Sequence, residues 1–335
     1  MDWSEAMFTK CLLKLAYLGT KYHGIAWQDD KLPTVELELF KALTRTCLVK
    51  DRTSCSFSRC GRTDKGVHAF GNYISLDLRV KNDGSMFDYV TMLNRVLPND
   101  IRILSVRQVP TEFDARFSCR QRTYKYFFTD LCGLDVCEME KAAQILCGTH
   151  DFRNFCRMDV NQTINYVRTV KSITFKKDSE LPVYEVCIVG SAFLWHQVRS
   201  MMSCLLLIGE GVEKASLLSS LLDIQAFPRK PIYELADPAG LVLFDCLYDH
   251  DLGGDILANA EDGLLALRQS LADSLRDSAV LKCLASISDD KLSILKRVKY
   301  TPILKRATAP SLEEKLQAES AKKRRLNNPL DELVD

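Results

Sequence analysis

One carboxylate, Asp64, lies among cations and glycines in the segment Gly61–Gly66, which reads Gly-Arg-Thr-Asp-Lys-Gly. Nearby positive charge favours the ionised form of a carboxyl group, so Arg62 and Lys65 would keep Asp64 negatively charged and nucleophilic. Glycines allow sharp turns and a close approach of the backbone to a ligand. An aspartate that only accepts hydrogen bonds in a glycine turn fits the same residue types. The residue types alone therefore predict either a catalytic carboxylate or a structural turn.

The elements around this segment are predicted from the periodicity of apolar residues. Residues 72–79 alternate between apolar and polar side chains, so Asp64 would lie on a loop that leads into a half-buried strand, a common place for catalytic groups. Further strands are predicted at 11–17, 101–109, 122–129, 167–176, 183–189 and 241–248. Helices are predicted at 35–48, 87–96, 138–146, 191–208, 213–222 and 256–287. Strands and helices mix without the strict alternation of a parallel doubly wound sheet, so the predicted fold class is α+β.

Length and composition set wider bounds. The 335 residues, of which 47% are hydrophobic, suffice for two domains or for one catalytic unit of two lobes. No run of apolar residues is long enough for a membrane span, and the opening MDWSEAMFTK does not read as a signal peptide. The 13 cysteines include no CxxC pair, so we expect reduced thiols in an intracellular protein and no metal.

Charge is distributed unevenly along the chain, although its net value is only +1. The stretch between Ala115 and Thr129 has no acidic residue and contains four cations, Arg116, Arg120, Arg122 and Lys125. Aromatic residues are interleaved with these cations. A second basic segment runs from Arg45 to Lys65. Cations gathered on one face are what contact with phosphates needs, whereas a solvated strand face would show the same pattern.

The order of the residues around Asp64 adds a resemblance. GRTDKGVHA resembles the signature of the TruA-type tRNA pseudouridine synthases, in which the aspartate is the catalytic residue. Other stretches resemble family motifs in the same order: LAYLGTKYHGIAWQ (15–28) with its Y-x-G-x-x-Y-x-G run, RTYKYFF (122–128), AFLWHQVRSMM (192–202) and GLVLFDCLY (240–248). SRCGRTDKGVHAFGN, FCRMD (155–159) and the WHQVR wording are similar to the eukaryotic branch that modifies tRNA positions 38 and 39. One departure is Glu36-Leu37-Glu38, where relatives usually carry a glycine after T-V-E.

The resemblance implies a fold and an activity. The fold would be the pseudouridine synthase fold, with a mixed, mostly antiparallel sheet, flanking helices and two lobes around a central cleft. We expect an N-terminal lobe at 1–110, a C-terminal lobe at 111–250 and an extension at 251–335. The activity would be isomerisation of uridine to pseudouridine in the anticodon stem-loop of tRNA at positions 38 and 39, without cofactor or metal. A synthase acting at another tRNA position and an inactive RNA-binding protein remain alternatives. A hydrolase of glycosidic bonds would need a second carboxylate, which the matched segments do not supply.

The resemblance also assigns roles to single residues. Asp64 would be catalytic, and Arg199 would hold it as a bidentate partner. Arg62 would take the place of the flipped nucleotide, Tyr124 would stack on the target base, and Leu243 would form an apolar wall of the pocket. No catalytic role is given to His68 or His196.

The partner implied is tRNA, held by an RNA-binding patch of Arg116, Arg120 and Lys125. Bacterial relatives bind tRNA across two subunits, which makes a homodimer one option here. We expect the protein in the nucleus, the cytoplasm or both, because Lys322–Arg325 fits a nuclear import signal as well as a solvated tail. Residues 318–333 are highly charged and predicted to be disordered, whereas YTPILKR (300–306) resembles an ordered C-terminal element.

Overall fold

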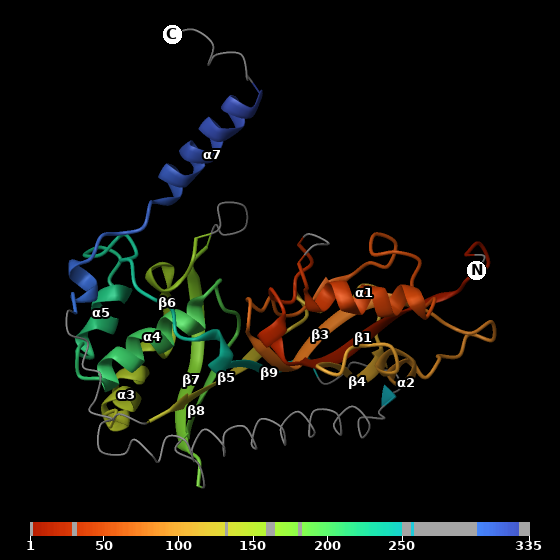
Figure 1. Cartoon of the computed structure of the whole chain (residues 1–335), viewed down its shortest axis with the longest axis horizontal. Coiled ribbons are helices and arrows are strands. Elements are labelled where there is room, and N and C mark those ends of the chain that lie inside the picture. The colour runs from red at the N-terminus through yellow and green to blue at the C-terminus, as the bar shows by residue number, and fades with distance from the viewer. Residues whose placement is uncertain are drawn as a thin grey trace, which may run out of the picture. The chain divides into compact units, whose positions relative to one another are not determined.

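The computed structural model describes residues 3–28, 32–130, 133–158, 165–179, 183–249, 256–257 and 300–327. The chain forms two compact units (Figure 1). Unit 1 comprises Met1–Thr129, Lys176–Val189 and Asp237–Lys296, and unit 2 comprises Asp130–Phe175, Gly190–Ala236 and Arg297–Asp335. The predicted ranges 1–110, 111–250 and 251–335 are continuous, whereas each unit joins three separate segments.

Unit 1 is built on a sheet. Its strands are β1 (Phe8–Tyr17), β2 (Ser58–Arg59), β3 (His68–Arg79), β4 (Ile101–Gln108), β5 (Gln121–Thr129), β8 (Val183–Gly190), β9 (Leu241–Leu247) and β10 (Ile256–Leu257). They follow the order β10-β4-β1-β3-β9-β5-β8, and β2 pairs with β3 outside this order. β1 is antiparallel to β3 and to β4, β5 is antiparallel to β9, and β3 is parallel to β9. This mixed, mostly antiparallel sheet with helices confirms the predicted α+β fold class.

The core of unit 1 lies between this sheet and the helices α1 (Val35–Arg45) and α2 (Tyr89–Asn94) (Figure 1). Leu13 of β1 pairs with Ile74 of β3, and both are fully buried. Helix α1 begins where the Thr34 hydroxyl accepts the Leu37 N–H at 3.2 Å, which satisfies one of the free N–H groups of its first turn. Apolar side chains of the strands and of one face of α1 are therefore buried.

Unit 2 is mainly helical. It contains α3 (Val136–Ala143), α4 (Gln197–Gly209), α5 (Ser216–Leu222) and α7 (Leu312–Asn327), together with β6 (Gly148–Asp151) antiparallel to β7 (Val167–Lys177). Helices α3 and α4 approach closely, because a Cβ atom on Gly209 would lie 2.4 Å from the sulfur of Met139. Across the described residues, no helix combines the length and the apolar character that crossing a membrane requires.

The predicted strands, and the helices predicted at 35–48, 87–96, 138–146 and 213–222, are confirmed with shifted ends. The helix predicted at 191–208 begins only at Gln197, because His196 has a φ of 68°. This left-handed conformation does not continue into a right-handed helix. The apolar residues before it are a loop whose Leu194 N–H donates to the Gln197 side-chain oxygen at 2.8 Å. The helix predicted at 256–287 lies outside the described residues, apart from the two residues of β10.

The C-terminal segment is more ordered than predicted. The prediction of disorder for 318–333 is wrong for the part up to Asn327, which belongs to α7. The reason is a capping box: the Glu314 N–H donates to the Ser311 hydroxyl at 3.1 Å, and the Ser311 N–H donates to the Glu314 carboxylate at 2.7 Å. Residues 328–333 lie outside the described residues. The ordered element predicted at 300–306 is confirmed, since Ile303 is fully buried and its N–H donates to Glu213 at 2.7 Å.

Candidate active site

Asp64 lies in unit 1, on the loop between β2 and β3, and its side chain is half-buried. The Val67 N–H donates to the Asp64 carbonyl at 3.1 Å, and Gly66 between them has a φ of 81°, a conformation that glycine favours. Arg62, two residues before Asp64, is exposed. The prediction of a loop that leads into a strand is confirmed.

The segment after β1 packs its backbone directly against this loop. A Cβ atom on Gly19 would lie 2.0 Å from the Val67 carbonyl oxygen, and one on Gly24 would lie 2.7 Å from the Thr63 carbonyl oxygen. Gly24 also has a φ of 94°. Only glycine permits so close an approach of two backbones together with such a φ. The two glycines of the Y-x-G-x-x-Y-x-G run are therefore needed to seat the Asp64 loop.

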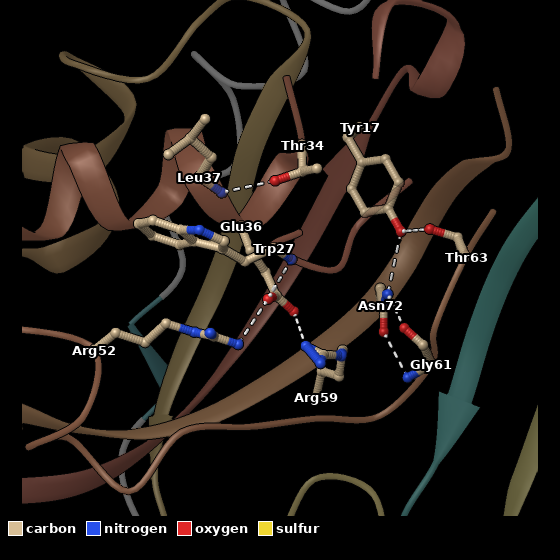
Figure 2. A network of polar contacts seen from close by, with 10 residues as sticks. All are labelled: Tyr17, Trp27, Thr34, Glu36, Leu37, Arg52, Arg59, Gly61, Thr63 and Asn72. Atoms are coloured by element: carbon tan, nitrogen blue, oxygen red, sulfur yellow. Dashed lines mark hydrogen bonds and ion pairs between the residues drawn. The ribbon is translucent and has the colours of Figure 1, made fainter. Parts of the chain in front are cut away.

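A buried polar network fixes the loop from the sheet side (Figure 2). The Asn72 amide donates to the Gly61 carbonyl at 2.9 Å, and the Asn72 oxygen accepts the Gly61 N–H at 3.1 Å. The same amide donates to the Tyr17 hydroxyl at 3.2 Å, and that hydroxyl lies 2.7 Å from the Thr63 hydroxyl. Asn72 is 0% exposed, and buried polar groups with all their partners in place rigidify their surroundings. The backbone just before Asp64 is thus held in one position.

Glu36 lies beside this network, at the start of α1 and away from water (Figure 2). Its carboxylate accepts the Trp27 N–H at 2.9 Å, pairs with Arg52 at 3.3 Å and pairs closely with Arg59. Burial raises the pKa of Glu36, while Arg59, the Trp27 N–H and Arg52 oppose that rise. Two cations of the basic segment therefore neutralise a buried carboxylate. The departure from the family pattern is the next residue, Leu37, which stands where relatives usually carry a glycine after T-V-E.

Tyr124 and Leu243 face each other on paired strands. Tyr124 of β5 is opposite Leu243 of β9, and Leu243 is also paired with Ala69 at the start of β3. Leu243 is fully buried, and a Cβ atom on Gly61 would lie 2.5 Å from its side chain. Tyr124 is 9% exposed, and burial raises the pKa of its phenol. The structure thus places both predicted pocket residues next to the backbone that carries Asp64.

The residues predicted to bind RNA differ in their surroundings. Arg116 is exposed. Arg120 pairs with Asp249 at 2.9 Å, and both side chains are exposed. Lys125 is half-buried and pairs with Glu185 at 3.0 Å. RNA phosphates would have to compete with two carboxylates for these cations, so the RNA-binding role of the three residues stays a prediction.

Arg199 belongs to unit 2, where it lies in the first turn of α4 and is half-buried. Its Nε donates to the Ala236 carbonyl at 2.8 Å, which fixes the direction of the guanidinium. The predicted ion pair between Arg199 and Asp64 stays a prediction.

Burial favours the neutral form of the two histidines without an assigned role. Burial lowers the pKa of His196 to about 4, helped by the cations of Arg199, Lys230 and Arg157. Burial also lowers the pKa of His68. A neutral, half-buried imidazole suits a structural residue.

Comparison with known proteins places the chain in a family. A family model described as tRNA pseudouridine synthase matches residues 142–249. tRNA pseudouridine synthase A of Methanosarcina acetivorans is 35% identical over 240 residues, which are 72% of this chain and 85% of that protein. This chain belongs to the tRNA pseudouridine synthase family. The resemblance predicted from the sequence is confirmed.

Within the family, similarity is higher to two eukaryotic relatives. In an alignment of 266 residues, the chain is 45% identical to the tRNA pseudouridine(38/39) synthase of Bos taurus. This match covers 71% of this chain and 55% of that protein. In an alignment of 263 residues, it is 43% identical to the protein of the same name in Saccharomyces cerevisiae. This match covers 74% of this chain and 59% of that protein. The chain thus spans little more than half the length of these relatives.

Several residues that support the family's aspartate loop are not predicted from the sequence. Tyr17 lies in a motif that assigns it no role, and Asn72 lies in phase with the apolar residues of its strand, where an asparagine is unexpected. Arg122 is predicted as a surface cation, yet it is buried and donates to the carbonyls of Cys60 at 3.3 Å and Arg116 at 3.0 Å. The signal for Tyr17 is its place in the Y-x-G-x-x-Y-x-G run. Arg122 opens RTYKYFF and Asn72 ends SRCGRTDKGVHAFGN. These motifs assign neither residue a role, and most of the partners of both residues lie in other elements of the fold.

Proposed function

We propose that this protein isomerises uridine to pseudouridine in tRNA, with Asp64 as the catalytic residue and positions 38 and 39 as its targets. The observation that carries the proposal is the rigid presentation of one carboxylate. Gly19 and Gly24 seat the Asp64 loop on one side, and Asn72 fixes it on the other. Relatives named tRNA pseudouridine(38/39) synthase support the choice of positions.

The reaction needs few groups. The N1–C1′ bond of uridine breaks, the uracil turns over, and C5 becomes bonded to C1′ in place of N1, while the proton displaced from C5 is balanced by one gained at N1. Nothing is oxidised or hydrolysed in this exchange. The Asp64 carboxylate can attack carbon and form a covalent intermediate, or it can remove a ribose proton as a general base. Both routes need a negatively charged group held in a fixed position, as the Asp64 loop provides.

Access to the target base is the second requirement. A uridine in the anticodon stem-loop is stacked or paired, so it has to leave the helix before a carboxylate can reach it. We assign to the exposed Arg62 the place that the uridine vacates. Tyr124 would stack on the extruded base, and Leu243 would form the apolar wall behind it. Stacking tolerates a base that turns in its own plane, as the uracil must do here.

The test is site mapping on tRNAs transcribed in vitro, which carry no modification beforehand. Each transcript has uridines at positions 38 and 39 as well as elsewhere, and pseudouridine is located by chemical modification and primer extension. We expect modification at 38 and 39. Modification confined to other positions would leave a synthase of different specificity. No modification, together with retained tRNA binding, would leave an RNA-binding protein without this activity.

For the location in the cell, we propose the nucleus, the cytoplasm or both, because the basic run Lys322–Arg325 fits an import signal and falls within α7. A fluorescent fusion with these four residues changed to alanine tests the nuclear share. Unchanged nuclear signal in that variant would exclude the run as an import signal. A homodimer stays a prediction, to be tested by the mass of the protein in solution.

A further inference from the structure

Three cysteines that are far apart in the sequence meet in unit 1. Cys60, Cys119 and Cys246 are 5%, 9% and 3% exposed, respectively. Their sulfur atoms all lie within 4.8 Å of one another. Since no two of them are close along the chain, a search for short cysteine spacings could not find the group.

The backbone around each of the three cysteines is fixed by pairing within the sheet. Cys60 follows β2, and its N–H donates to the Tyr73 carbonyl at 2.8 Å. Cys119 precedes β5, and the N–H of the next residue donates to the Leu247 carbonyl at 2.9 Å. Cys246 lies within β9. The sulfur atoms are therefore brought together by the fold itself and require no ligand to assemble them.

A buried cation accompanies the group. Arg122 of β5 is the pairing partner of Cys246 in the strand register, and it donates to the Cys60 carbonyl at 3.3 Å. Its guanidinium interacts electrostatically with all three sulfur atoms. A divalent ion with three thiolates has a net charge of −1, which one arginine balances. A monovalent ion would leave one further negative charge.

We propose that Cys60, Cys119 and Cys246 bind a thiophilic d10 metal ion, Zn²⁺ or Cu⁺, in a buried site that stabilises the fold. Metal–sulfur bonds of about 2.3 Å place three sulfur atoms about 3.8 to 4.0 Å apart, so the observed cluster would need only a small contraction. The three thiols would lose their protons to solvent on binding, and no electron would be transferred. Soft thiolate ligands select these ions over hard cations.

The two ions differ in the ligands that they require. Among the described residues, no fourth histidine, cysteine or carboxylate joins the group. Three thiolates complete a trigonal site for Cu⁺, whereas Zn²⁺ usually takes a fourth ligand, which here would have to be water. Either ion would tie together the segment before Asp64, the start of β5 and the strand that carries Leu243. The site would thus stabilise the scaffold of the proposed active site without taking part in the reaction.

The experiment measures metal binding by the full-length protein, purified with a reductant, stripped by dialysis and loaded in separate samples with Zn²⁺ or anaerobically with Cu⁺. Metal content per chain is measured by mass spectrometry, and competition with a chelator gives the affinity. We expect one ion per chain. Cys246→Ala should weaken binding at least about 10-fold. The matched control is Cys204→Ala, which removes a fully buried thiol outside the group and should leave binding unchanged.

X-ray absorption of the loaded wild-type protein supplies a readout that needs no variant. Three sulfur neighbours around the metal are expected, with one further oxygen in the Zn²⁺ sample. Nitrogen or oxygen ligands alone, or an equal loss of binding in both alanine variants, would overturn the proposal. So would a disulfide between two of the three cysteines in a separate sample purified without reductant. Each readout is independent of pseudouridine formation. The proposed function can therefore be disproved while the metal site is confirmed, and the metal site can be disproved while the function is confirmed.

Discussion

Asn72 holds Gly61 by both of its backbone polar groups, accepting the N–H at 3.1 Å and donating to the carbonyl at 2.9 Å. This imitates a pair of strand hydrogen bonds three residues before Asp64. Asn94 does the same for Ile103, with both distances at 2.9 Å. The two pairs are chemically alike, but only the Asn72 pair holds the Asp64 loop. They therefore form a natural test and control.

The first prediction concerns Asn72→Ala. The variant leaves the N–H and the carbonyl of Gly61 buried without their partners, which should cost about 1–3 kcal/mol of folding stability. It should also slow pseudouridine formation about 100-fold, because small misplacements of reacting groups are costly. Urea denaturation measures the stability, and single-turnover kinetics at saturating enzyme measure the rate of the folded fraction.

Asn94→Ala is the matched control for this variant. It should lose a similar amount of stability but keep the wild-type rate, because its partner Ile103 is in β4. Equal rates in the two alanine variants would mean that Asn72 contributes to folding alone.

The second prediction concerns Asp64→Asn, which keeps the shape of the side chain and removes its charge. The rate of pseudouridine formation should fall by about 10²- to 10⁴-fold, which is the range for loss of a positioned acid or base. Binding of tRNA should persist, since the side chain keeps its shape and Asn72 still holds the loop through Gly61. Turnover assays and filter binding measure the two quantities. Substantial turnover by the purified variant would remove Asp64 from the reaction.

The third prediction separates base stacking from core packing at Tyr124. Tyr124→Phe keeps the ring and should keep binding and rate, whereas Tyr124→Leu should weaken tRNA binding by about 1–3 kcal/mol and slow the reaction. The control is Tyr126→Leu, on the same face of β5 and 3% exposed. It should reduce stability without changing the reaction. If both leucine variants changed stability alone, Tyr124 would be a core residue.

The strands are predictable because their burial follows a period of two, which is a local property of the sequence. Asn72 shows where such reasoning ends. It lies in phase with Ile74, Leu76 and Leu78 of β3, so the period of two predicts burial, and the residue is indeed 0% exposed. The period does not predict which groups a buried asparagine bonds to. Its partners Gly61 and Tyr17 come from other segments of the chain. The hydrogen bonds that make its burial favourable form only when the chain folds, so local sequence patterns do not predict them.

The charged residues show the same limit. Arg52, Arg59 and Arg122 all belong to the predicted basic segments, but the first two pair with buried Glu36 and the third is buried itself. A sum of charges along a segment does not show which cations are already neutralised. The start of α7 is the opposite case. Ser311 and Glu314 have the spacing of a capping box, and this spacing can be recognised in the sequence. The high charge of the following residues predicts disorder instead, and that prediction is wrong up to Asn327.

The fourth prediction concerns pH and His196. The pKa of this group is lowered to about 4 in the folded protein, whereas an unperturbed histidine has a value of about 6.5. Between these values the unfolded chain binds more protons than the folded chain, so stability increases with pH in this window and is lost as pH falls through it. His196→Asn, a residue that tolerates the left-handed conformation, should flatten this part of the curve. Thermal melting from pH 4 to 7 compares the variant with wild type.

The same comparison requires a restricted pH range, since carboxylates also titrate near pH 4. The slope is therefore compared at pH values from about 5 to about 6.5, where the unfolded histidine titrates and unperturbed carboxylates do not. The variant at 196 should change the slope there. An unchanged slope there would place the loss of stability on other groups.

The last prediction concerns the cations assigned to RNA. Removing one cation that binds a phosphate should reduce the slope of log K against log salt by about 0.7 to 0.9. Arg116→Ala should do so for all tRNAs alike, because binding to phosphates carries no sequence information. Arg120 is already paired with exposed Asp249, so Asp249→Asn should release this cation and strengthen binding. Lys41→Ala, an exposed cation paired on α1, is the control that should change nothing. Binding titrations at several salt concentrations measure wild type and the three variants. A slope that Arg116→Ala leaves unchanged, with Asp249→Asn no tighter than wild type, would place the tRNA on another surface.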